Sequence, residues 1–254
     1  MNRFLRWPSG AVAPFGARPE QAAASVAHRI QNYTLLAPHH FEPDYAYPLL
    51  VWLHGPDDDE RQLRHVMKYI SLRNYVAVGP RGCCAPEEGR LGFQWRQLEP
   101  AIAAAEQRVF DAIDSACQQF RVDEERLFLA GYQCGGTMAL RIGLRHPERF
   151  AGAASIGGPF PTGHAPLAQL RRSRRLPLLI AQGRDSELYP LRVACGELRL
   201  FHAAGMHVTV RQYPCGDELT TRMLQDLNVW MMEQVQGAVE ADRADLLAYP
   251  GDAN

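Results

Sequence analysis

The segment 126–137 constrains the fold of this chain more than any other. An apolar run, Leu127–Ala130, breaks at Gly131, and Gly135 and Gly136 then open a second apolar stretch with helical spacing. Glycine has no Cβ, so it permits sharp turns and close approaches between backbones. The pattern therefore predicts a buried strand, a sharp turn and a helix in direct succession.

This turn has the frame of the nucleophile elbow, G-x-S-x-G, in which a strained strand-to-helix turn exposes a reactive side chain. Here the frame reads Gly131-Tyr132-Gln133-Cys134-Gly135, so the apex is Gln133. A primary amide has no ionisable proton, and a base cannot convert it into an attacking alkoxide or thiolate. The segment thus keeps the pattern of an elbow without a nucleophile at its apex.

Length and charge set broad limits. The 254 residues suit one α/β domain, which we place at 26–237, after an N-terminal arm (1–25) and before a C-terminal tail (238–254). The net charge of −1 provides no global field for nucleic acid or acidic lipid. One basic cluster, formed by Arg171, Arg172, Arg174 and Arg175, is predicted to be a solvated loop, with a phosphate or acidic-partner contact as the minor alternative.

The sequence also predicts a compartment. No apolar stretch is long enough to span a membrane, and the first residues lack the apolar core of a signal peptide. The six cysteines form no C-x-x-C pair, which favours free thiols. We therefore expect a cytoplasmic protein.

Apolar runs alternate with amphipathic stretches along the chain. We predict strands at 28–37, 49–53, 75–78, 127–130, 151–156, 176–181 and 207–213, and helices at 59–68, 98–120, after Gly135, at 190–204 and at 219–235. Such alternation predicts an α/β fold, with a mostly parallel sheet covered by helices on both faces.

Four segments in order carry a resemblance to a known family. They are Pro48–Gly55, the elbow 131–136, Gln182–Pro190 and Tyr213–Glu218. The chain resembles the α/β-hydrolases of the carboxylesterase, phospholipase and acyl-thioesterase group. The resemblance implies the α/β-hydrolase fold with little or no cap domain.

The resemblance also implies where a catalytic triad would stand. The family needs a serine, a carboxylate and a histidine in this chain order. The nucleophile position holds Gln133, the acid position holds Ser186 or its neighbour Asp185, and the histidine position holds Asp217. The predicted triad is therefore degenerate. We expect the Gln133 amide to donate a hydrogen bond to the Asp217 carboxylate.

The predicted oxyanion region is incomplete as well. The resemblance places Pro56 at one donor position, and proline has no backbone N–H. The second donor, the backbone N–H of Cys134, would remain. We expect the pocket around these positions to be lined by His54, Gly55, Phe93, Trp95 and Gln133.

Three alternatives use other residues for chemistry. Cys134 could be a rebuilt nucleophile at a helix start that lowers its pKa. Asp217, with Asp185 or Glu187, could activate a water. A metal is the third alternative, although no spacing demands it; its candidate ligands are Cys83, Cys84, Cys134, Cys215, Asp185 and Asp217.

The favoured prediction is a non-catalytic relative of the esterases that uses no cofactor or metal. It would bind a small ester-like or acyl ligand, or a protein partner, in a pocket at the carboxyl edge of the sheet. We expect no binding of nucleic acid. A homo-oligomer is compatible with the sequence, but no feature indicates one.

Overall fold

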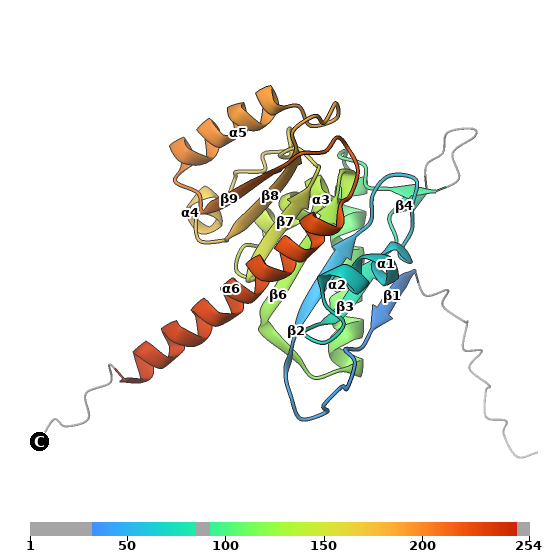
Figure 1. Ribbon diagram of the computed structural model, residues 1–254, viewed down its shortest axis with the longest axis vertical. Helices are drawn as coiled ribbons and strands as arrows, with labels where there is room; N and C mark the ends of the chain where they lie inside the picture. Colours follow the sequence, from blue (N-terminus) through green and yellow to red (C-terminus); the bar gives the residue numbers. More distant parts are fainter. Residues whose placement is uncertain (1–31, 85–91, 248–254) are drawn as a thin grey trace, which may run out of the picture. The chain divides into compact units, whose positions relative to one another are not determined.

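The computed structural model describes residues 32–84 and 92–247. Their main sheet has seven strands in the order β1-β3-β2-β6-β7-β8-β9, and only β1 runs antiparallel to its neighbour (Figure 1). The strands are β1 (Tyr33–Leu36), β2 (Tyr47–Leu53), β3 (Val76–Pro80), β6 (Val122–Tyr132), β7 (Gly152–Ile156), β8 (Leu178–Gly183) and β9 (Val208–Tyr213). A separate hairpin pairs β4 (Cys83–Cys84) with β5 (Phe93–Gln94).

Helices cover both faces of the main sheet (Figure 1). They are α1 (Gln62–Ile70), α2 (Ala101–Gln119), α3 (Cys134–Arg145), α4 (Leu170–Ser173), α5 (Leu191–Ala204) and α6 (Thr221–Leu247). The helices α2, α3 and α5 pack on one face, whereas α1 and α6 pack on the other. This is the two-sided α/β arrangement that the sequence predicts.

The central strands are apolar throughout because both of their faces are buried. In β2, Leu49 and Val51 enter the core beneath α2 and α3, while Leu50 and Trp52 enter the core beneath α1 and α6. Every residue of β2 is buried. The continuous apolar runs of the sequence therefore serve two cores, one on each side of the sheet.

Several predicted bounds differ from the structure. The first predicted strand is reduced to β1 among the described residues, α1 starts three residues later than expected, and the arginine cluster contains the short helix α4 rather than only a loop. The hairpin of β4 and β5 was not predicted. The expected arm, 1–25, lies outside the described residues, as do 248–254.

The last helix extends further than the predicted range 219–235. The helix α6 does not end near Gly237 but continues to Leu247. A glycine inside a helix costs only about 1 kcal/mol relative to alanine, so one glycine does not have to end it. Among the described residues, no helix is long and apolar enough to cross a membrane.

Candidate functional site

The turn between β6 and α3 has the strained geometry of an elbow. Gln133 has φ 47° and ψ −114°, outside the favoured regions for a residue with a side chain. Its backbone N–H donates to the carbonyl of Ile156 at 2.8 Å, and its carbonyl accepts from Thr137 N at 2.9 Å. These bonds hold Gln133 at the apex, as the sequence pattern predicts.

Glycines make this turn possible because the backbones around it nearly touch. A Cβ on Gly135 would clash with the carbonyl oxygens of Leu53 and His54. A Cβ on Gly158, after β7, would clash with the carbonyl oxygen of Gln133. The elbow is therefore wedged between the ends of β2 and β7 at the carboxyl edge of the sheet, where parallel α/β sheets bind ligands.

The side chain of Gln133 is tied to its surroundings by its amide. Its Nε2 donates to the Tyr132 hydroxyl at 2.9 Å and to the backbone carbonyl of Asp217 at 3.0 Å. The Tyr132 hydroxyl also donates to that carbonyl in a short contact. The sequence correctly predicts that Gln133 meets Asp217, but the predicted acceptor was wrong: it is the main-chain carbonyl and not the carboxylate.

The Asp217 carboxylate is instead bound by the loop after β8. The Ser186 hydroxyl donates to its Oδ1 in a short contact, and the backbone N–H groups of Glu187 and Leu188 donate at 3.2 and 3.3 Å. Burial alone would raise the pKa of Asp217, but these three hydrogen bonds outweigh it and lower the pKa. Asp217 is thus a carboxylate that is held ionised.

The two residues considered for the acid position differ in their surroundings. Ser186 is buried, faces Asp217, and also accepts the backbone N–H of Tyr189 at 2.8 Å. Asp185 is exposed, and its carboxylate pairs with the neighbouring Arg184 at 3.2 Å. Glu187 is exposed too and reaches Asp217 through its backbone N–H. The side chains therefore place Ser186, and not Asp185, beside Asp217.

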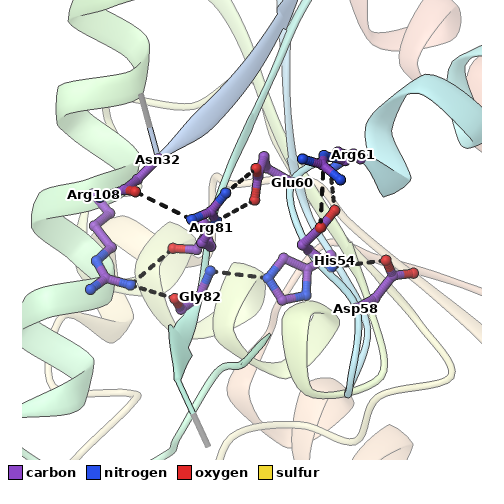
Figure 2. Close-up of polar contacts among 9 residues, drawn as sticks. Asn32, His54, Asp58, Glu60, Arg61, Arg81, Gly82 and Arg108 are labelled. Carbon is purple, nitrogen blue, oxygen red and sulfur yellow. Dashed lines mark hydrogen bonds and ion pairs between the residues drawn. The ribbon is translucent and has the colours of Figure 1, made fainter. Parts of the chain in front are cut away.

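The loop after β2 is built around His54, which is fully buried. Figure 2 shows its ring directed at the backbone of Gly82, whose N–H lies 3.0 Å from Nε2. The Nδ1 atom lies 2.7 Å from the Gly55 carbonyl, so both ring nitrogens are engaged. Burial lowers the pKa of His54, partly offset by the Gly55 hydrogen bond. A neutral, fully engaged ring serves as a structural support.

Charged residues brace the segment that His54 contacts. Arg81 pairs with the buried Glu60 through Nε at 2.6 Å and through NH2 at 2.5 Å (Figure 2). Arg108 donates to the carbonyls of Arg81 and Gly82 at 3.0 and 2.6 Å. The backbone partner of His54 is therefore fixed from two sides.

Gln62 supports the same loop from α1. Its Oε1 accepts from Trp52 Nε1 at 2.8 Å and from Gly55 N at 3.2 Å, and its Nε2 donates to Asp58 at 2.7 Å. Pro56, at the predicted oxyanion position, is exposed and supplies no N–H.

The aromatic residues expected in the pocket have different roles. Trp95 is only 2% exposed, belongs to the core, and donates from Nε1 to the His54 carbonyl at 3.1 Å. Trp95 therefore supports the loop after β2 from the core and does not line an open pocket, contrary to the prediction. Phe93 is partly exposed, and its backbone N–H donates to the Asp58 carbonyl at 3.0 Å, which ties β5 to the loop after β2.

Cys134 starts α3, but its surroundings disfavour a thiolate. Burial raises the pKa of its thiol, and hydrogen bonds from backbone groups offset this only in part. A rebuilt nucleophile would need a lowered pKa, and burial acts in the opposite direction. Among the residues whose side chains the structure describes, which leave out Cys84 and 238–247, no group of three or more His, Cys, Asp and Glu side chains is arranged to hold a metal ion.

Tyr132 and Gln62 were missed by the sequence reasoning. Tyr132 packs so closely on Gly55 that a Cβ there would overlap its ring, and its hydroxyl reaches the loop after β9. It joins the two loops beside the elbow. Its place next to the apex was a signal, but its partners lie in distant segments.

Solved structures with the same architecture define the class of this fold. Arabidopsis thaliana SOBER1 matches with a TM-score of 0.64 and 20% identity, over 75% of this chain and all of that one. The Bacillus cereus carboxylesterase matches with a TM-score of 0.64 and 17% identity, over 82% of this chain and 96% of that one. The fold is that of the α/β-hydrolases.

The sequence comparison narrows the class to a family. The model of the Phospholipase/Carboxylesterase family matches residues 43–233, and the chain therefore belongs to that family. "Probable carboxylesterase SOBER1-like" of Arabidopsis thaliana is 23% identical over 213 residues, 76% of this chain and 81% of that protein. "Putative esterase NocK" of Nocardia uniformis subsp. tsuyamanensis is 36% identical over 78 residues, which span 31% of this chain and only 22% of that protein.

Proposed function

We propose that this chain is a non-hydrolytic member of the Phospholipase/Carboxylesterase family. One observation carries the proposal: the strained apex of the elbow holds Gln133, whose amide is committed to the Tyr132 hydroxyl and the Asp217 carbonyl. An amide at this position cannot attack an ester. Asp217 and Ser186, the residues at which the resemblance predicts the histidine and the acid, bond to each other.

The proposed role is to bind a small ester-like or acyl ligand at the carboxyl edge of the sheet. An open hollow of about 280 Å³ beside the loop after β2 supports this role. It is lined by Asp58, Gln62, His65, Val66, Tyr69, Leu219, Thr221 and Leu224, so none of the residues predicted to line the pocket contributes to it. Buried apolar side chains and a few fixed polar groups are typical of small-molecule sites. The polar network around Asp217 would hold the neighbouring loops in place.

The alternative function is hydrolysis at a rebuilt site. Cys134 lies next to the apex, but a partly buried thiol with a raised pKa supplies little thiolate at neutral pH. Asp217 could activate a water, but a carboxylate whose pKa is lowered is a weak base. Both observations favour the non-hydrolytic proposal.

The test is the hydrolysis of p-nitrophenyl butyrate by the purified protein and four variants, of which Cys134→Ala and Asp217→Asn test the two rebuilt sites. We expect the wild-type protein and Cys134→Ala to be equal to background. The combined variant Gln133→Ser/Ser186→Asp/Asp217→His should hydrolyse the ester measurably. Adding Pro56→Ala to it should raise the rate further, because one oxyanion donor contributes about 10²–10³.

Two outcomes would contradict the proposal. Wild-type turnover that disappears in Cys134→Ala would identify a cysteine hydrolase. Wild-type turnover that disappears in Asp217→Asn but survives in Cys134→Ala would identify a water activated by the carboxylate.

A further inference from the structure

Positive charge is concentrated in one part of the chain. Residues 166–204 contain seven arginines and three acidic residues, a net charge of +4, so the remainder of a chain with net charge −1 carries −5. These residues include both α4 and α5. The small total therefore conceals a local asymmetry, and fields near a protein surface depend on such local distributions.

The arginines of α4, α5 and the residues after α4 lack acidic partners. In the described part of the chain, no ion pair involves Arg171, Arg172, Arg174, Arg175, Arg192 or Arg199. Two of the three acids of this segment are engaged elsewhere: Asp185 pairs with Arg184, and Glu197 binds Tyr189 and the backbone of Phe160. The third, Glu187, is exposed and forms no ion pair with any of these arginines. The six arginines thus present uncompensated charge.

The segments that carry these arginines are adjacent. Arg174 donates from Nε to the carbonyl of Ala204, the last residue of α5, at 2.6 Å. Gly205, which ends α5, also lies against the Arg174 side chain. In Figure 1, α4 lies close to one end of α5.

Exposed leucines accompany the arginines on and before α5. Four leucines are between 41% and 61% exposed: Leu188, Leu191, Leu198 and Leu200. The pair Leu191–Arg192 recurs seven residues later as Leu198–Arg199. Seven residues are about two helical turns, so each leucine and each arginine has its equivalent on the same side of α5. We call these four leucines and the six unpaired arginines the α4–α5 surface.

We propose that the α4–α5 surface docks on a lipid bilayer with anionic headgroups. Headgroup phosphates and carboxylates would pair with arginines that the protein leaves without acidic partners. The leucines would enter the boundary between headgroups and acyl chains, as the apolar side chains of interfacial helices do. The exposed leucines favour a bilayer over nucleic acid, which would leave them unburied.

Docking in this manner would bring the bilayer next to the candidate site. The backbone N–H of Leu188 donates to the Asp217 carboxylate at 3.3 Å, while the Leu188 side chain is exposed. One residue thus belongs to the loop that holds Asp217 and to the docking surface. The inference does not depend on the proposed function, because it rests only on the charge and exposure of this surface.

The test is co-sedimentation of the full chain with sucrose-loaded vesicles of phosphatidylcholine and phosphatidylserine, at about two to one, beside vesicles of phosphatidylcholine alone. We expect binding only to the anionic vesicles, and its loss at high salt. Because each basic residue near such a surface changes binding about fivefold, Arg192→Gln/Arg199→Gln should weaken binding about 25-fold.

A matched variant separates this surface from general charge. Arg64 and Arg73 are exposed and belong to α1 and the turn that follows it. Arg64→Gln/Arg73→Gln removes the same charge and should change binding by less than about twofold, since these residues lie outside the docking surface. Leu191→Ser/Leu198→Ser should weaken binding without changing net charge.

Three results would overturn the proposal. The first is equal binding to both kinds of vesicle, and the second is equal weakening by the two arginine pairs. The third is no vesicle binding together with tight binding of heparin or an acidic peptide, which would assign the surface to a soluble polyanion. None of these results would alter the ester assay, which contains no lipid, so the two proposals can fail separately.

Discussion

Two parts of the candidate site resemble a catalytic site to different degrees. They are the elbow between β6 and α3, and the pair of loops after β8 and β9. The elbow keeps its backbone: Gln133 has the strained φ and ψ, and glycines occupy the positions where a Cβ would clash. The two loops lie beside the elbow, but Ser186 and Asp217 form their own hydrogen-bonded pair.

This difference shows that scaffold and chemistry are encoded separately. The geometry of the elbow depends on glycines, which have no side chain, and on main-chain hydrogen bonds. Neither of these depends on which side chain stands at the apex. Catalysis depends on the presence of three particular side chains. The first requirement can therefore persist in a chain that does not meet the second, as we propose for this one.

The largest expected effect comes from adding a methyl group to the elbow. Gly135→Ala would place a Cβ against the carbonyl oxygens of Leu53 and His54, and backbone atoms cannot rotate away. We expect the free energy of unfolding to fall by about 3 kcal/mol or more, measured by urea denaturation. The matched control is Gly196→Ala in α5, where nothing lies within 4 Å and alanine should stabilise by about 0.5–1 kcal/mol.

Equal stability of Gly135→Ala and the wild-type protein would mean that the elbow has room to relax. In that case these glycines would not fix the backbone geometry of the elbow, and the elbow would not differ from the two loops in this respect.

The next effect concerns the loops after β8 and β9. In Asp217→Asn, an amide group would face at least one of the donors from Ser186, Glu187 and Leu188. We expect a loss of about 1–3 kcal/mol at neutral pH, measured by urea denaturation. Asp185→Asn is the control, because an exposed pair with Arg184 contributes about 0–1 kcal/mol.

The same pair of variants makes a prediction about pH. The folded-state pKa of Asp217 is lowered, so its stabilisation is present above the unfolded pKa of about 3.9. It is lost as the pH falls through the lower, folded pKa. The stability difference between the wild-type protein and Asp217→Asn should therefore shrink in acid; a constant difference would show that the carboxylate charge has no role in holding the loops.

A smaller effect is expected at the buried histidine. Burial lowers the folded pKa of His54, so below its unfolded value of about 6.5 the unfolded chain takes up a proton that the folded chain does not. The free energy of unfolding should fall from pH 7 to pH 5. His54→Gln should flatten this profile, whereas His39→Gln, at an exposed position, should leave it unchanged. A wild-type profile without this decline would contradict the assignment of a neutral, buried ring.

The smallest effect is a difference in thiol reactivity. Cys134 is partly buried with a raised pKa, whereas Cys195 on α5 is exposed. Iodoacetamide at neutral pH, followed by peptide mapping, should label Cys134 more slowly than Cys195. Faster labelling of Cys134 would favour the rebuilt cysteine site.

Much of the fold could be predicted from the sequence because its strands are buried on both faces. The apolar runs at 49–53 and 127–130 lie within β2 and β6, and the elbow follows from its glycines. The pair β4 and β5 could not be predicted, because two strands of two residues have no periodicity. The short helix α4 is a single turn within a basic cluster, and its sequence carries no helical pattern.

The candidate site could be predicted only as a set of positions. The order of the motifs identified Gln133 and Asp217, but the path of the loop after β9 decides that a main-chain carbonyl accepts the amide. The choice between Asp185 and Ser186 depends on one residue of loop length. Packing shows which side chain lies beside Asp217: Ser186 is buried against it, whereas Asp185 is exposed beside Arg184.

The central claim is that the elbow holds no nucleophile, and a fluorophosphonate tests it most directly. This reagent phosphonylates activated serines in hydrolase sites, and intact-mass spectrometry counts the adducts. We predict no adduct on the wild-type protein and one adduct on Gln133→Ser/Ser186→Asp/Asp217→His, at residue 133. An adduct on the wild-type protein within the segment 131–136 would contradict the account.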